Sequence, residues 1–98
     1  MMVTAWNNGS ESFGFRITKA DRDKFFSNNW KGVEIILPNS EKINVGISSS
    51  FWKKCHELRN KEIGNWLKSN GKDNWKKYNP PKFNLIPIEK SCFRVTIE

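Results

Sequence analysis

The chain has 98 residues, of which 37% are apolar and 13% aromatic, and this size and composition are typical of one small globular domain. No apolar run exceeds three residues, which excludes a membrane-spanning helix, since such a helix needs about 20. Two cysteines and one histidine are too few for a four-ligand zinc site or a multi-disulfide framework. With no secretory pattern in the first residues, we expect free thiols and a cytoplasmic protein.

Positive charge is concentrated in the second half of the sequence. The net charge is +7, and residues 51–98 hold eleven basic and five acidic groups against six and five in residues 1–50. A field of this sign attracts polyanions and speeds encounter with them. The other interpretation is that the lysines only keep a small protein in solution.

The first half predicts a strand, a short helix and a hairpin, in that order. Residues 1–11 are expected to be a loosely ordered lead, and alternating residues predict a strand over 13–18. Thr18 followed by Asp21 matches a helix capping box, so a short helix is expected over 19–27. Two further alternating segments, 33–37 and 43–47, flank turn-forming residues and predict a hairpin.

The second half predicts more helix and then two strands. Phe51, Cys55 and Leu58 recur at helical spacing, and we expect Asn60 to interrupt this helix before a second one that stops at Gly71. Residues 72–82 contain a Pro-Pro pair and predict a surface loop, and the last two strands are expected at 83–85 and 93–97. The sum is an α+β domain spanning residues 1–98: a small, partly open β-barrel of about five to seven mainly antiparallel strands with two or three short helices.

Catalytic patterns are missing from the sequence. The likeliest general base, His56, has no evident partner set, because the neighbouring Cys55 points about 100° away from it in a helix. The carboxylates are scattered, and no Gly-rich phosphate loop is present. We therefore expect a non-enzymatic protein with no cofactor and no metal site.

Basic residues interleaved with aromatic ones are the most distinctive pattern. They occur in Trp52-Lys53-Lys54 and in Trp75-Lys76-Lys77-Tyr78. Lysines can neutralise phosphates while aromatic faces stack on unpaired bases. The competing interpretation is that both tryptophans pack in the core and the lysines are their solvated flanks.

The segment FGFRITKADRDKF, followed by the strand VEIILP, resembles the start of the B3-like DNA-binding pseudobarrel of plant transcription factors and restriction-enzyme recognition domains. The likeness covers residues 13–38. It implies an open barrel of about seven strands that grips the major groove of DNA with two arms. It also implies that Arg16, Lys19 and Arg22 lie near the earlier arm.

The sequence thus predicts a nucleic-acid-binding module, with double-stranded DNA as the favoured partner. The expected binding residues are Arg16, Lys19, Arg22, Lys53, Lys54, Arg59, Trp75, Lys76, Lys77 and Tyr78. The rival hypothesis is a small protein-interaction or inhibitor module, of the phage or toxin–antitoxin type, that covers an acidic protein surface. A basic groove favours nucleic acid, whereas a flat patch centred on exposed tryptophan favours protein.

Overall fold

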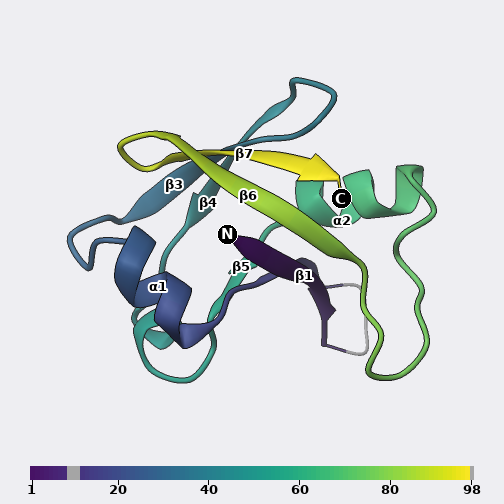
Figure 1. Cartoon of the computed structure of the whole chain (residues 1–98), viewed down its shortest axis with the longest axis horizontal. Helices are drawn as coiled ribbons and strands as arrows, with labels where there is room; N and C mark the ends of the chain where they lie inside the picture. The colour runs from purple at the N-terminus through teal and green to yellow at the C-terminus, as the bar shows by residue number, and fades with distance from the viewer. Residues whose placement is uncertain (9–11, 98) are drawn as a thin grey trace.

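Seven strands form one mixed sheet, with two α-helices, in the computed structural model (Figure 1), which describes residues 1–8 and 12–97. The strand order is β4-β3-β7-β6-β1-β2-β5, and every described pairing is antiparallel except that of β3 with β7. The expected α+β class and a mostly antiparallel sheet are therefore confirmed, and the sheet does not close into a barrel. Within the described ranges, no helix is long and apolar enough to span a membrane.

The elements follow one another as strand, strand, helix, hairpin, 3-10 turn, strand, helix and hairpin. Their bounds are β1 Met2–Asn7, β2 Phe13–Arg16, α1 Lys19–Phe25, β3 Gly32–Ile36, β4 Lys42–Gly46, η1 Ser49–Trp52, β5 Glu57–Arg59, α2 Lys61–Ser69, β6 Lys82–Glu89 and β7 Cys92–Ile97.

Strand β1 occupies much of the segment that was expected to be a loose lead, and that expectation is wrong for residues 2–7. Val3 and Ala5 point into the core while Thr4 between them is half-exposed, as a strand with one buried face requires. β1 lies between β2 and β6 in the sheet, and the backbone N–H of Ala5 also donates to the carbonyl of Pro81 at 2.9 Å. Residues 9–11 of the expected lead lie outside the described ranges.

Helix α1 begins where its capping signal predicts. The Thr18 hydroxyl accepts a hydrogen bond from the backbone N–H of Asp21 at 3.2 Å, which satisfies one of the free donors of the first turn. The helix ends at Phe25, two residues earlier than expected. The β3–β4 hairpin also forms at the predicted place, with Val33 paired to Val45 and Ile35 to Ile43.

The helix expected from Phe51 through Leu58 is wrong. Only the 3-10 turn η1 forms there, and Glu57–Arg59 is instead strand β5, paired with β2. Leu58 is fully buried opposite Phe15, so a long-range strand pairing outweighs the local helical spacing. Asn60 then caps α2, because its side-chain oxygen accepts from the Glu62 N–H at 2.7 Å.

Helix α2 ends at Ser69, two residues before the glycine that was predicted to stop it. Gly71 has a φ of 66°, in the left-handed region that favours glycine. The N–H of Lys72 donates to the carbonyl of Leu67 at 2.8 Å, and that of Gly71 donates to Lys68, which is the Schellman arrangement.

The core is formed by apolar side chains from all seven strands, from α2 and from the segments around α1 and η1, and α2 packs on β2. Three rings meet in the part of the core beside α2: Trp66 of this helix contacts Phe15 and Phe83 edge-on, with ring centroids 6.4 and 5.3 Å away. Gly64 lets the helix approach closely, since a Cβ there would lie 3.1 Å from the Phe13 ring. Such edge-to-face aromatic packing stabilises the core beyond the area it buries.

The two edge strands of the sheet, β4 and β5, are consecutive in the chain and come close to one another without forming a ladder. The side-chain amide of Asn60 donates to the carbonyl of Asn44 at 3.1 Å and joins the two edges. We call this junction the β4–β5 seam. The segment that connects these strands, residues 47–56, contains two of the predicted binding lysines.

Candidate nucleic-acid interface

One hollow brings together two of the predicted binding residues from distant parts of the sequence. Arg16, at the end of β2, and Lys54, after η1, both line a cavity of about 570 Å³. His56 lines it as well, and its carbonyl accepts from the N–H of Ile17 at 2.8 Å. We call this cavity the Arg16–Lys54 hollow.

Two more predicted lysines flank this hollow in the chain. Lys19 directly follows Thr18, a lining residue, and Lys53 directly precedes Lys54. Both are exposed, as is Lys54, and none of the three forms an ion pair with a carboxylate of the described residues. Their ammonium groups are therefore available to an anionic ligand.

A buried carboxylate orients two of the predicted arginines. The side chain of Glu57 is only 3% exposed, and its Oε1 lies 2.9 Å from Nη2 of Arg59 while its Oε2 lies 3.5 Å from Nε of Arg16. The hydrogen bond with Glu57 raises the pKa of Arg59 above its usual value, and a guanidinium is charged throughout the physiological range in any case. Both arginines remain about half-exposed, so each keeps donors for a ligand.

Arg59 also covers an aromatic ring on the outer face of the sheet. Its guanidinium carbon lies 4.6 Å from the centroid of the Trp6 ring. Trp6 and Arg59 sit on either side of Gly14, which pairs with both, so no side chain separates them. A Cβ on Gly14 would overlap the carbonyl of Leu58, and this close approach requires glycine.

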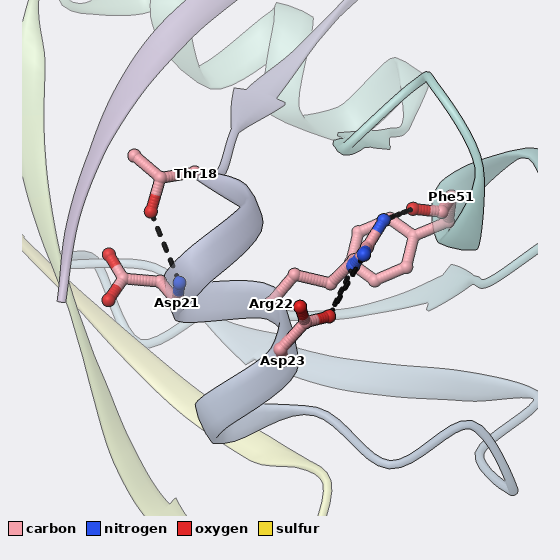
Figure 2. A network of polar contacts seen from close by, with 5 residues as sticks. All are labelled: Thr18, Asp21, Arg22, Asp23 and Phe51. Atoms are coloured by element: carbon pink, nitrogen blue, oxygen red, sulfur yellow. Dashed lines mark hydrogen bonds and ion pairs between the residues drawn. The ribbon is translucent and has the colours of Figure 1, made fainter.

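Arg22 was predicted to bind nucleic acid, but its guanidinium is buried and used within the fold. The residue is 4% exposed. Nε and Nη2 contact the Asp23 carboxylate at 3.0 and 2.9 Å, and Nη1 donates to the carbonyl of Phe51 at 3.1 Å (Figure 2). We therefore leave Arg22 out of the interface.

The same network holds the 47–56 segment against α1. Figure 2 shows Arg22 reaching from the helix to Phe51 in η1. Its guanidinium also lies 5.1 Å from the centroid of the Trp52 ring. Arg22 is thus a positioning residue for the turn that carries Lys53 and Lys54.

The second basic-aromatic segment lies on the long loop between α2 and β6. Trp75 is half-buried and packs against the core, as the packing interpretation expected, whereas Lys76 and Lys77 are exposed. Tyr78 is 89% exposed and has a φ of 65°, a strained conformation for a residue with a large side chain. None of the described hydrogen bonds or ion pairs connects this loop to the Arg16–Lys54 hollow.

Trp6 and Glu57 belong to this site but were missed from the sequence. Trp6 lay in the expected lead, although the alternation of Val3 and Ala5 with half-exposed neighbours is a strand signal. Glu57 lay in the helix that was expected around Phe51, Cys55 and Leu58, and nothing local to it indicates a buried carboxylate. Its position follows from the pairing of β5 with β2.

Among the described residues, no group of three or more His, Cys, Asp or Glu side chains is placed to hold a metal ion. No protein-family model, curated protein or solved structure significantly matches this chain.

Proposed function

We propose that this protein is a non-enzymatic nucleic-acid-binding module whose preferred partner is double-stranded DNA. The observation that carries the proposal is the convergence of Arg16 and Lys54 on one hollow, beside the Glu57-anchored Arg59. Lys19 and Lys53 extend this set of cations without being neutralised by ion pairs. With both cysteines free, we place this activity in the cytoplasm.

The lysines and the arginines of this surface would make different contacts with DNA. Lysines are compact charges that suit phosphates and set the position of a duplex, while guanidinium groups can also contact base edges in two places at once. Because Glu57 fixes Arg16 and Arg59, less conformational entropy is lost when either of them meets DNA. We therefore assign phosphate contacts to Lys19, Lys53 and Lys54, and base contacts to the two arginines.

A B3-like pseudobarrel is the finer fold assignment within this proposal. Seven strands, mostly antiparallel, with two short helices agree with what the resemblance of residues 13–38 implies. The close approach of β4 and β5 also supports a nearly closed arrangement. The assignment rests on that resemblance and on the number of strands and helices.

The alternative is a protein-interaction module that binds an acidic surface through the 75–78 loop. The specific observation that favours it is the strong exposure of Tyr78, which directly follows Lys76 and Lys77 in the chain. The turn that carries it is held by a hydrogen bond of 2.9 Å from the Asn79 N–H to the Lys76 carbonyl. An exposed aromatic group beside cations is typical of interface anchors. Against it, none of the five tryptophans is more than partly exposed, so no exposed tryptophan centres a docking patch.

The test is to measure duplex affinity against salt concentration for the wild type and three double variants. Lys53→Ala/Lys54→Ala changes the proposed interface, Lys76→Ala/Lys77→Ala changes the alternative loop, and Lys42→Ala/Lys68→Ala is a control with the same change in charge. The control residues lie at the start of β4 and in α2 and line no part of the hollow. Binding is followed by fluorescence anisotropy of a labelled random duplex.

We expect saturable binding that weakens steeply with salt, because phosphate contacts release counterions. Loss of two phosphate contacts should reduce the slope of log affinity against log salt by about 1–2 for the Lys53/Lys54 variant. The control variant should change it much less. A duplex affinity that is absent at low salt overturns the proposal, and a slope that falls only for the Lys76/Lys77 variant moves the interface to the 75–78 loop.

A further inference from the structure

A second hollow lies beside the η1 turn and is lined by two tryptophans. Its volume is about 720 Å³, within the range of small-molecule sites. Trp30 and Trp52 line it together with Asn28, Asn29, Lys31 and Lys53. We call it the tryptophan hollow.

Both indoles are held in place by the core behind them. Trp30 contacts the rings of Phe26 and Phe93 edge-on, with centroid distances of 6.0 and 6.4 Å. Trp52 lies at 86° to the Phe51 ring and is covered by the buried guanidinium of Arg22. Aromatic surfaces that are already ordered lose little entropy when a flat ligand stacks on them.

The remaining lining is polar and positive. Lys31 and Lys53 are exposed, and no carboxylate is among the lining residues. The amides of Asn28 and Asn29 each supply donors and acceptors of the kind that recognise the polar edge of a base. This combination of flat apolar faces, amides and cations is complementary to a nucleotide, which joins a flat base to a phosphate.

Two consecutive lysines connect the tryptophan hollow with the proposed nucleic-acid surface. Lys53 lines this hollow, and the adjacent Lys54 lines the Arg16–Lys54 hollow. Arg22 steadies the η1 turn, which directly precedes both lysines. A backbone that follows the lysines would therefore pass the mouth of the tryptophan hollow.

We propose that the tryptophan hollow receives one unstacked base from nucleic acid bound along Lys53 and Lys54, so that the protein prefers a duplex with an unpaired nucleotide. The proposal rests on the nucleic-acid-binding function proposed above. The indoles stack on the base, the asparagine amides contact its edge, and Lys31 and Lys53 hold its phosphates. An unpaired base enters at lower cost than a paired one, because no base pair has to be broken.

The test compares three duplexes of equal length: fully paired, with one extra unpaired 2-aminopurine, and with an abasic residue in the same extra position. The abasic duplex bends like the bulged one but offers no base. Ser49→Phe fills the hollow from an exposed lining position, and Ser69→Phe makes the same change on an exposed serine of α2. Lys31→Ala removes a cation that lines this hollow and not the other.

We expect the wild type and Ser69→Phe to bind the 2-aminopurine bulge about tenfold more tightly than the other two duplexes, with quenching of the 2-aminopurine emission by stacking. Ser49→Phe should abolish both the preference and the quenching while leaving affinity for the paired duplex unchanged, and Lys31→Ala should reduce the preference. Equal affinity of the wild type for all three duplexes overturns this inference and leaves the proposed function intact. Absence of binding to any of them overturns both.

Discussion

Glu57 is the residue on which the charge arrangement of the proposed interface depends. A carboxylate with a 3% exposed side chain loses most of its hydration, and the two arginines compensate for that loss. Both arginines are themselves about half in solvent, so the net stabilisation is far smaller than that of a fully buried pair. The chief effect of the carboxylate is to fix where two positive groups point.

Glu57→Gln should therefore have opposite effects on folding and on binding. The amide keeps the shape of the side chain but weakens the contacts with Arg16 and Arg59, and we expect the free energy of unfolding to fall by about 1–2 kcal/mol. Because one negative charge is removed beside the interface, affinity for random duplex at low salt should rise. Urea unfolding and fluorescence anisotropy measure the two effects. A fall in affinity would show instead that the orientation of Arg16 and Arg59 by Glu57 outweighs the repulsion between its carboxylate and DNA, and an unchanged free energy of unfolding would contradict the contribution of Glu57 to folding.

The two cysteines differ in reactivity because of their surroundings. Cys92 is 5% exposed and its thiol donates to Glu34 Oε1 at 3.4 Å, whereas Cys55 is half-buried. Burial first, and then the contact with Glu34, raises the pKa of Cys92, so less of it is thiolate at any given pH. We expect a thiol reagent to modify Cys55 well before Cys92 in the folded protein, as followed by mass spectrometry with peptide mapping.

The raised pKa of Cys92 also gives a direction for stability at alkaline pH. Between the unfolded and the folded pKa of this thiol the folded protein binds more protons, so the free energy of unfolding decreases as pH rises through that interval. Cys92→Ser removes the thiol and should lessen this alkaline decrease. An unchanged alkaline slope in the variant would contradict the assignment to Cys92.

At the scale of elements, Asn60 connects the start of α2 to the edge of the sheet. Its side-chain oxygen caps the helix and its side-chain amide crosses the β4–β5 seam to Asn44. One residue thus links local and long-range structure. Caps of this type contribute about 1 kcal/mol, and an exposed hydrogen bond contributes less.

Two substitutions separate these contributions. Asn60→Ala removes both contacts and should lower the free energy of unfolding by about 1–2 kcal/mol. Asn60→Asp keeps an oxygen for the Glu62 N–H but has no donor for Asn44, so its loss should be clearly smaller, as measured by denaturant unfolding. Equal losses in the two variants would show that the seam, and not the cap, carries the effect.

The same elements show what the sequence could predict. The helix cap at Thr18 and the β3–β4 hairpin depend on neighbours within a few residues, and both form where they were predicted. Strand β5 could not be predicted in this way, because its three residues become a strand only by pairing with β2, more than forty positions earlier. For the same reason Arg16 and Lys54 were each predicted as binding residues, but their position at one hollow was not predicted. The burial of Arg22 was not predicted either, because it depends on the carbonyl of Phe51, 29 positions away.

At the scale of the whole molecule, the strand order predicts where the structure is most resistant to local opening. β7 lies between β3 and β6, and β6 between β7 and β1, whereas β4 and β5 are at the edges. A central strand forms backbone hydrogen bonds with a neighbour on each side. The side chains of β6 and β7 that face the core are almost fully buried: Phe83, Leu85, Phe93 and Val95. Amides in such strands open only with global unfolding.

Hydrogen exchange followed by NMR checks this expectation. The slowest amides should be those of β6 and β7 that pair with each other, and the amides of β5 and of the 47–56 segment should exchange much faster. Addition of saturating duplex should slow exchange in residues 47–56 if the proposed interface lies there. Protection in β5 equal to that in β7 would contradict the description of β5 as an edge.

The central position of β7 has a consequence for how the chain is made. Among the described strands β7 is synthesised last, yet it is the strand through which the β3–β4 hairpin pairs with the rest of the sheet. Until it has emerged from the ribosome, β3 and β6 each expose an unpaired backbone edge, and the apolar faces that will meet across them stay open to water. The nascent chain can complete this sheet only after translation of β7, so holdase chaperones that cover exposed strands can act on β3 and β6 until that point.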